Sequence, residues 1–164
     1  MKMPPALIVL FVLALSACAT SSPFELKGVN RTLSPALAKS GTAHQGQTAI
    51  WGGLIIQSTN LKDRSEIEVL AYPLNEQGEP IRSASAQGRF YIQQDGYLET
   101  AQYAAGRWIS VLGTVKPPVQ GKVGSADYTF AVIKSVQLEL WPDPSQSDSS
   151  NPRVQFGIGI GISR

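Results

Sequence analysis

The chain has 164 residues, of which 43% are hydrophobic, and a formal net charge of +2 at pH 7. Its single cysteine excludes a disulfide framework, so the fold must depend on burial of a hydrophobic core, and the length suits one domain. The basic residues are scattered rather than clustered, which argues against a surface that follows a phosphate backbone. No nucleic acid is therefore expected as a partner.

The N-terminus has the pattern of a secretory signal peptide. Lys2 precedes an apolar run from Ala6 to Leu15, and small residues follow that run. As a helix, an apolar run of this length would rise about 15 Å, half of the roughly 30 Å of bilayer hydrocarbon, which is too short to span a membrane. We therefore predict that residues 1–17 are a signal peptide, whose removal leaves the mature chain close to neutral.

The end of this signal contains the only cysteine. Leu15-Ser16-Ala17-Cys18 resembles the bacterial lipobox. The resemblance implies cleavage between Ala17 and Cys18, a diacylglycerol on the thiol, and a fatty acid such as palmitate on the new amine. Two or more acyl chains anchor a protein stably, so the predicted partner of Cys18 is membrane lipid. The alternative is an ordinary signal peptide, cut at Ala17 or Ala19, which would leave a free thiol.

The residue after the cysteine indicates to which membrane a lipoprotein is sorted. It is Ala19 and not an aspartate. By resemblance to Gram-negative lipoproteins, the absence of an aspartate implies transfer to the outer membrane, with the protein facing the periplasm.

Residues 18–45 are predicted to be a tether and approach segment. It is polar and interrupted by proline, and within it Ser34 and Pro35 would cap and open a single helical turn.

From Thr48 onward the sequence is typical of β structure, with turn residues between apolar runs. The predicted strands lie in residues 48–57, 65–74, 88–94, 107–115 and 128–141. Gly52 and Gly53 inside the first strand indicate a bulge or a close approach of strands. Residues 95–106 are predicted to be a short helical crossover, and residues 117–124 a loop rich in proline and glycine.

Alternation of apolar residues assigns one face of each strand to the core. It places three residues of the second strand together (Ile67, Val69 and Ala71) and three of the last (Val136, Leu138 and Leu140). Five strands with internal glycines predict an all-β fold over residues 46–142, a small five-stranded, partly open barrel of the OB type. A β-sandwich is the alternative.

The composition changes after Trp141. Residues 143–164 are predicted to be a flexible linker followed by a tail in which isoleucine alternates with glycine. Two interpretations of residues 154–162 stay open. The tail pairs with its own barrel, or it docks onto an envelope protein, a second copy of the chain or the membrane surface.

Several motifs in order resemble one family. They include Trp51-Gly52-Gly53, Tyr72-Pro73-Leu74, Gly88-Arg89-Phe90 and Gly106-Arg107 leading into Gly113. With the lipobox, they are similar to the Slp family, the starvation-associated outer-membrane lipoproteins of Gram-negative bacteria. The chain departs from the family pattern at Ile50, Glu79 and Ser125. The resemblance implies a lipoprotein linked to stationary phase and to envelope or acid stress, without a known activity or catalytic residues.

Three residues are candidates for ligand binding. Arg89 and Arg107 each follow a glycine and precede an aromatic residue, and we predict a paired basic site on adjacent strands for the phosphate or carboxylate of a lipid or glycan. Trp51 would complete it with an aromatic surface. The alternatives are that each arginine pairs with a strand residue such as Glu68, and that Trp51 belongs to the core or rim.

Catalysis finds no support in the sequence. His44 is the only histidine, and a zinc site or a histidine-based triad needs further ligands or a second functional group. Glu66 and Glu68 are read as a solvated strand face. We therefore expect no metal, no cofactor and no enzymatic activity, but an outer-membrane lipoprotein that supports the envelope under stress. The alternative is a module whose barrel face binds an envelope glycan, lipid or protein.

Overall fold

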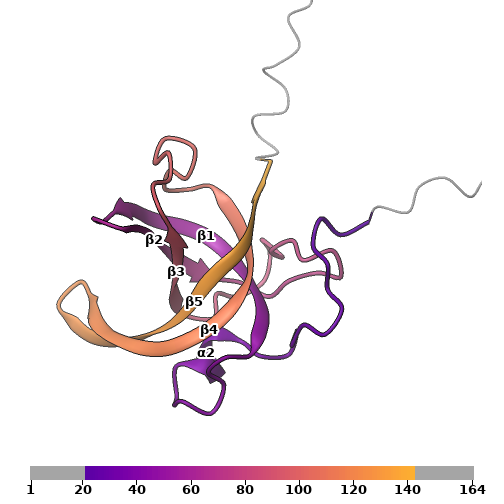
Figure 1. Ribbon diagram of the computed structural model, residues 1–164, viewed down its shortest axis with the longest axis horizontal. Helices are drawn as coiled ribbons and strands as arrows, with labels where there is room; N and C mark the ends of the chain where they lie inside the picture. Colours follow the sequence, from indigo (N-terminus) through magenta and orange to yellow (C-terminus); the bar gives the residue numbers. More distant parts are fainter. Residues whose placement is uncertain (1–20, 143–164) are drawn as a thin grey trace, which may run out of the picture.

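The computed structural model describes residues 21–142 and contains one helical turn and five strands (Figure 1). These are α2 (Pro35–Ala38), β1 (Thr48–Asn60), β2 (Arg64–Ala71), β3 (Arg89–Asp95), β4 (Trp108–Val123) and β5 (Ala126–Trp141). The predictions for the signal peptide, for Cys18 and for the 154–162 tail lie outside the described residues.

The five strands form one sheet that closes on itself in the order β1-β2-β3-β5-β4. All neighbouring strands are antiparallel except β3 and β5, which are parallel and join only from Phe90–Ala131 to Gln93–Lys134. The prediction of an all-β, OB-like five-stranded barrel is thereby confirmed, with the ring closed through this short parallel join. The β-sandwich alternative is wrong, because a single closed sheet has no second sheet to pack against.

The core lies inside this ring. In β2 the alternation is as predicted, with Ile67, Val69 and Ala71 buried and Glu66 and Glu68 on the outer face. In β3, Phe90 and Ile92 are fully buried, and the Phe90 ring meets Trp51 edge to face at 5.3 Å.

The two glycines of β1 mark a close approach of strands, one of the two alternatives expected there. A Cβ on Gly53 would lie 1.9 Å from the carbonyl oxygen of Leu70, and a Cβ on Gly52 would lie 2.8 Å from that of Ile109. The irregularity in the β1–β2 register falls further along, between Ile55 and Gln57. Glycine is therefore required where the neighbouring strands pack closely, whereas the register shift lies at residues that are not glycines.

The predicted helical crossover over residues 95–106 is wrong, because this segment forms successive turns. Only one turn of helix-like hydrogen bonding occurs, in which Glu99 O accepts from the amides of Gln102 and Tyr103. Two side chains of β1 donate hydrogen bonds to main-chain carbonyl groups of this segment: Asn60 donates to Leu98 O, and Ser58 donates to Tyr103 O. These bonds fix the segment against the barrel instead of letting a helix propagate.

The predicted loop over residues 117–124 is also wrong, since β4 continues to Val123 and only Gly124 and Ser125 form a turn. Pro117 and Pro118 lack an amide N–H, but they lie where the register with β5 shifts, so no ladder bond is lost there. The strands β4 and β5 consequently extend past the ring as a long hairpin, drawn in orange in Figure 1.

The predicted alternation at the end of β5 fails at one residue. Between Leu112 and Gly113 the register shifts, so that Val136 faces no partner and is 74% exposed. Leu138 and Leu140 pack against the core as predicted. A bulge therefore turns Val136 outward, which sequence alternation alone does not reveal.

The segment before β1 packs against the barrel from Phe24 onward. Phe24, Leu33 and Ala38 are buried, and the predicted turn with Ser34 as its cap is confirmed as α2. The folded domain thus includes much of residues 18–45, which the sequence predicted to be a tether and approach segment.

Candidate ligand-binding pocket beside Trp51

The first predicted site residue, Arg89, forms an ion pair. Its Nη1 lies 2.6 Å from Oε1 of Glu68 on β2, and its main-chain N–H donates to the Tyr128 hydroxyl at 2.9 Å. The pairing with Glu68 was the alternative weighed from the sequence. The charge of Arg89 is thus compensated by Glu68 on the neighbouring strand.

The second, Arg107, lies just before β4 and donates to the main-chain carbonyl of Gln102 at 3.4 Å. Strands β3 and β4 are not neighbours, because β5 lies between them in the ring. The predicted pairing of Arg89 and Arg107 on adjacent strands is therefore wrong. Ligand binding by either arginine alone stays a prediction.

The third, Trp51, belongs to the core. It is 2% exposed, and its indole N–H donates to Leu33 O at 2.6 Å. It also lines a pocket of about 230 Å³ at one side of the barrel, which we call the Trp51 pocket.

Three parts of the chain build the Trp51 pocket. Residues 31–35 of the N-terminal segment and residues 50–52 of β1 line it. Residues 72–74 and Gln87, from the connection between β2 and β3, complete the lining. Of the predicted ligand-binding residues, Trp51 thus lines this pocket, and Arg89 and Arg107 do not.

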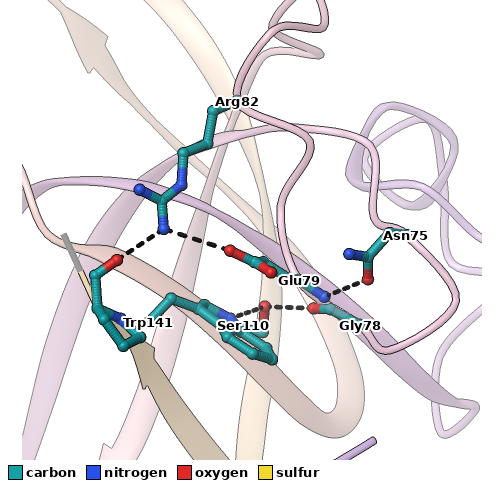
Figure 2. A network of polar contacts seen from close by, with 7 residues as sticks. Asn75, Gly78, Glu79, Arg82, Ser110 and Trp141 are labelled. Atoms are coloured by element: carbon teal, nitrogen blue, oxygen red, sulfur yellow. Dashed lines mark hydrogen bonds and ion pairs between the residues drawn. The ribbon is translucent and has the colours of Figure 1, made fainter. Parts of the chain in front are cut away.

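The connection over residues 72–88, which we call the β2–β3 loop, is fixed by buried polar contacts (Figure 2). Ser110 of β4 is fully buried, donates to Gly78 O at 2.6 Å and accepts the indole N–H of Trp141 at 2.9 Å. Gly78 has φ +87°, a conformation that favours glycine, and a Cβ there would lie 2.9 Å from Ile50.

A second set of contacts ties the β2–β3 loop to the end of β5. Arg82 forms an ion pair with the carboxylate of Glu79 at 3.3 Å (Figure 2), and it also donates to the main-chain carbonyl of Pro142 at 2.8 Å. Its guanidinium also lies over the Trp108 ring, 5.3 Å from the centroid. The loop that carries one wall of the Trp51 pocket is therefore held at several points.

A smaller hollow of about 120 Å³ lies on the outer face of β1, β2 and β3. Gln57, Thr59, Glu66, Glu68 and Tyr91 line it. Partial burial, followed by the charges of Glu68 and Glu66, raises the pKa of the Tyr91 hydroxyl above its usual value.

This shift predicts a loss of stability in alkali. The folded protein keeps the Tyr91 proton to a higher pH than the unfolded chain, so the unfolded chain ionises first. Stability should therefore fall as pH rises above about 10, and the fall should stop once Tyr91 also ionises in the folded state. Tyr91→Phe should reduce that fall when thermal midpoints are compared from pH 8 to 11.5. Equal pH profiles of the two proteins would contradict the assignment.

Among residues 21–142 no group of three histidine, cysteine or acidic side chains is placed to hold a metal ion. No helix in this range is long and apolar enough to cross a membrane. In this part of the chain, the buried side-chain nitrogen and oxygen atoms all have hydrogen-bond partners, which is what a packed barrel requires.

Sequence reasoning missed Arg31. It lines the Trp51 pocket and donates to Asn75 O at 2.9 Å, across 44 residues of chain. A lone arginine in a polar segment carries no local signal, so only the fold reveals its position.

The fold defines a class of small OB-like barrel, and the comparisons with known proteins define the family. A model of the outer membrane lipoprotein Slp family matches residues 15–158, so the chain belongs to that family. It is 29% identical to the lipoprotein YeaY of Escherichia coli K12 over 134 residues, covering 80% of this chain and 68% of that protein. It is 28% identical to outer membrane protein Slp of the same organism over 148 residues, covering 86% and 77%.

Among solved structures, the chain is similar to a small single-stranded DNA-binding protein from Streptomyces coelicolor. The match has 13% identity and a TM-score of 0.37, and it covers 62% of this chain and 97% of the other. A likeness at this level supports no inference about a ligand.

Proposed function

We propose that this lipoprotein is a periplasm-facing binding module, anchored in the outer membrane through acylated Cys18, whose Trp51 pocket takes a component of the cell envelope. The single observation that carries the proposal is the pocket itself, a concave site lined by apolar residues and a few polar side chains. Membership in a family of outer membrane lipoproteins supports the location.

The proposed action is binding and not chemistry. The titratable side chains of the Trp51 pocket are Arg31 and Tyr72, with no carboxylate or histidine to act as a general base. A role in supporting the envelope during starvation, stationary phase or acid stress is proposed with it, because the motifs of the sequence resemble starvation-associated lipoproteins. Docking of the 154–162 tail onto an envelope protein or a second copy also stays a proposal.

Closing the pocket tests the binding function. Gln87 is exposed at one wall, so Gln87→Trp should fill the entrance without disturbing the core. The matched control is Gln120→Trp, because Gln120 is also exposed, lies on the β4–β5 hairpin and does not line the pocket.

The measurement is binding of purified peptidoglycan fragments and outer-membrane glycolipid to the mature lipoprotein in nanodiscs. We expect Gln87→Trp to weaken binding at least about tenfold, the loss expected when a ligand can no longer enter its site. Gln120→Trp should bind like the unaltered protein. Equal binding by all three proteins would refute the pocket as the binding site.

A further inference from the structure

The Trp51 pocket has one charge. Arg31 is the only charged residue that lines it. No carboxylate of residues 21–142 lies within ion-pair distance of Arg31, in contrast to Arg64, Arg82 and Arg89, which are all paired with glutamates. A cation without a counter-ion at the wall of a cavity favours a ligand with a negative charge.

The guanidinium of Arg31 is nevertheless oriented. Its Nη2 donates to Asn75 O at 2.9 Å, and Asn75 in turn accepts the amides of Gln77 and Glu79 on its side-chain oxygen. One of five N–H donors is thus used, so that the others stay available to an anionic group. Positioning by a neutral carbonyl fixes the arginine without cancelling its charge.

Two further side chains of the pocket have hydrogen-bonding capacity to spare. Within residues 21–142, no hydrogen bond ends on the hydroxyl of Tyr72 or on the side-chain amide of Gln87. Both suit the hydroxyl groups of a ligand. Trp51, in contrast, has no donor left for a ligand, since its indole N–H is used on Leu33 O.

The size of the cavity limits the ligand. A cavity of about 150 Å³ accommodates benzene, so the 230 Å³ found here suits one substituted six-membered ring. We propose that the Trp51 pocket takes a monosaccharide-sized ligand bearing one carboxylate or phosphate, with its anionic group on Arg31. This rests on the proposed binding function and names the ligand class for the same pocket.

Sugar probes that differ in charge test the ligand class. Glucuronate, glucose 6-phosphate and neutral methyl glucoside are titrated into the mature lipoprotein in nanodiscs, and affinity is measured by ligand-observed NMR. The variants are Arg31→Gln, which removes the charge, and Arg31→Lys, which keeps it without the planar fork. Arg64→Gln is the matched control, because Arg64 is also an exposed arginine but lies on β2, outside the pocket.

We expect at least one anionic sugar to bind about tenfold or more tighter than methyl glucoside, the range for a hydrogen bond to a charged group. Arg31→Gln should remove that difference, Arg31→Lys should keep part of it, and Arg64→Gln should keep all of it. Equal affinity for the neutral sugar, an unchanged preference in Arg31→Gln, or no binding of any probe would each overturn the ligand class. The binding function is judged separately, by the effect of Gln87→Trp on envelope fractions.

Discussion

Gly53→Ala should unfold the barrel or leave it barely stable. The added Cβ would lie 1.9 Å from Leu70 O and 3.1 Å from the Cα of Ala71, so β2 would have to move away from β1. Both contacts are with main-chain atoms of a strand that is also paired with β3, and such atoms cannot rotate aside. We expect a loss of about 3 kcal/mol or more in the free energy of unfolding, against a total of roughly 5–15 kcal/mol for a domain.

The matched control is Gly41→Ala, because a Cβ at Gly41 would meet nothing within 4 Å. That variant should be as stable as the unaltered protein or slightly more stable, since alanine restricts the unfolded chain. Urea unfolding followed by tryptophan fluorescence measures both. A Gly53→Ala protein with unaltered midpoint would show that β1 and β2 are not packed as closely as described.

Cys18→Ala should abolish stable membrane attachment. Acyl chains contribute about 0.8 kcal/mol per buried methylene, and no stretch of the sequence is long and apolar enough to cross a bilayer. Without the thiol, the diacylglycerol has no point of attachment. Fractionation of cells should therefore find the variant absent from the outer membrane, and its mass should contain no lipid.

Ala19→Asp is the companion to that variant. It keeps Cys18, the proposed site of lipidation, but it introduces the aspartate that, by resemblance to Gram-negative lipoproteins, favours retention in the inner membrane. We expect the lipidated protein to move from the outer to the inner membrane fraction. An unaltered distribution of Cys18→Ala would contradict the anchor, and an unaltered distribution of Ala19→Asp would contradict only the sorting.

The strands were predictable because a half-buried strand alternates along its length. Ile67, Val69 and Ala71 show this pattern in β2, and the two glycines of β1 indicated the close approach of strands. The family was also recognisable, since its motifs lie within these strands and their turns.

The errors came from contacts that local patterns do not encode. Residues 95–106 have helix-forming residues, but hydrogen bonds from Ser58 and Asn60 hold them in turns. Pro117 and Pro118 suggested a loop, yet both lie at a register shift where a strand tolerates proline.

The site was only partly predictable for the same reason. Whether two strands are neighbours depends on the order in which the ring closes, and that order separates Arg89 from Arg107. Trp51 was identified as a candidate from its motif, but Arg31 joins it only because residues 31–35 fold against the β2–β3 loop. Contacts between residues so far apart in the sequence are revealed only by the structure.

The most direct test of the binding function is a chemical-shift map of the mature lipoprotein in nanodiscs, recorded as peptidoglycan fragments and outer-membrane glycolipid are added. We predict that the shifted amides cluster in residues 31–35, 50–52 and 72–74 and at Gln87, the parts of the chain that line the Trp51 pocket. Shifts centred instead on Glu68, Arg89 and Tyr91, or on Arg107, would contradict this account and return the binding site to the outer face of the barrel.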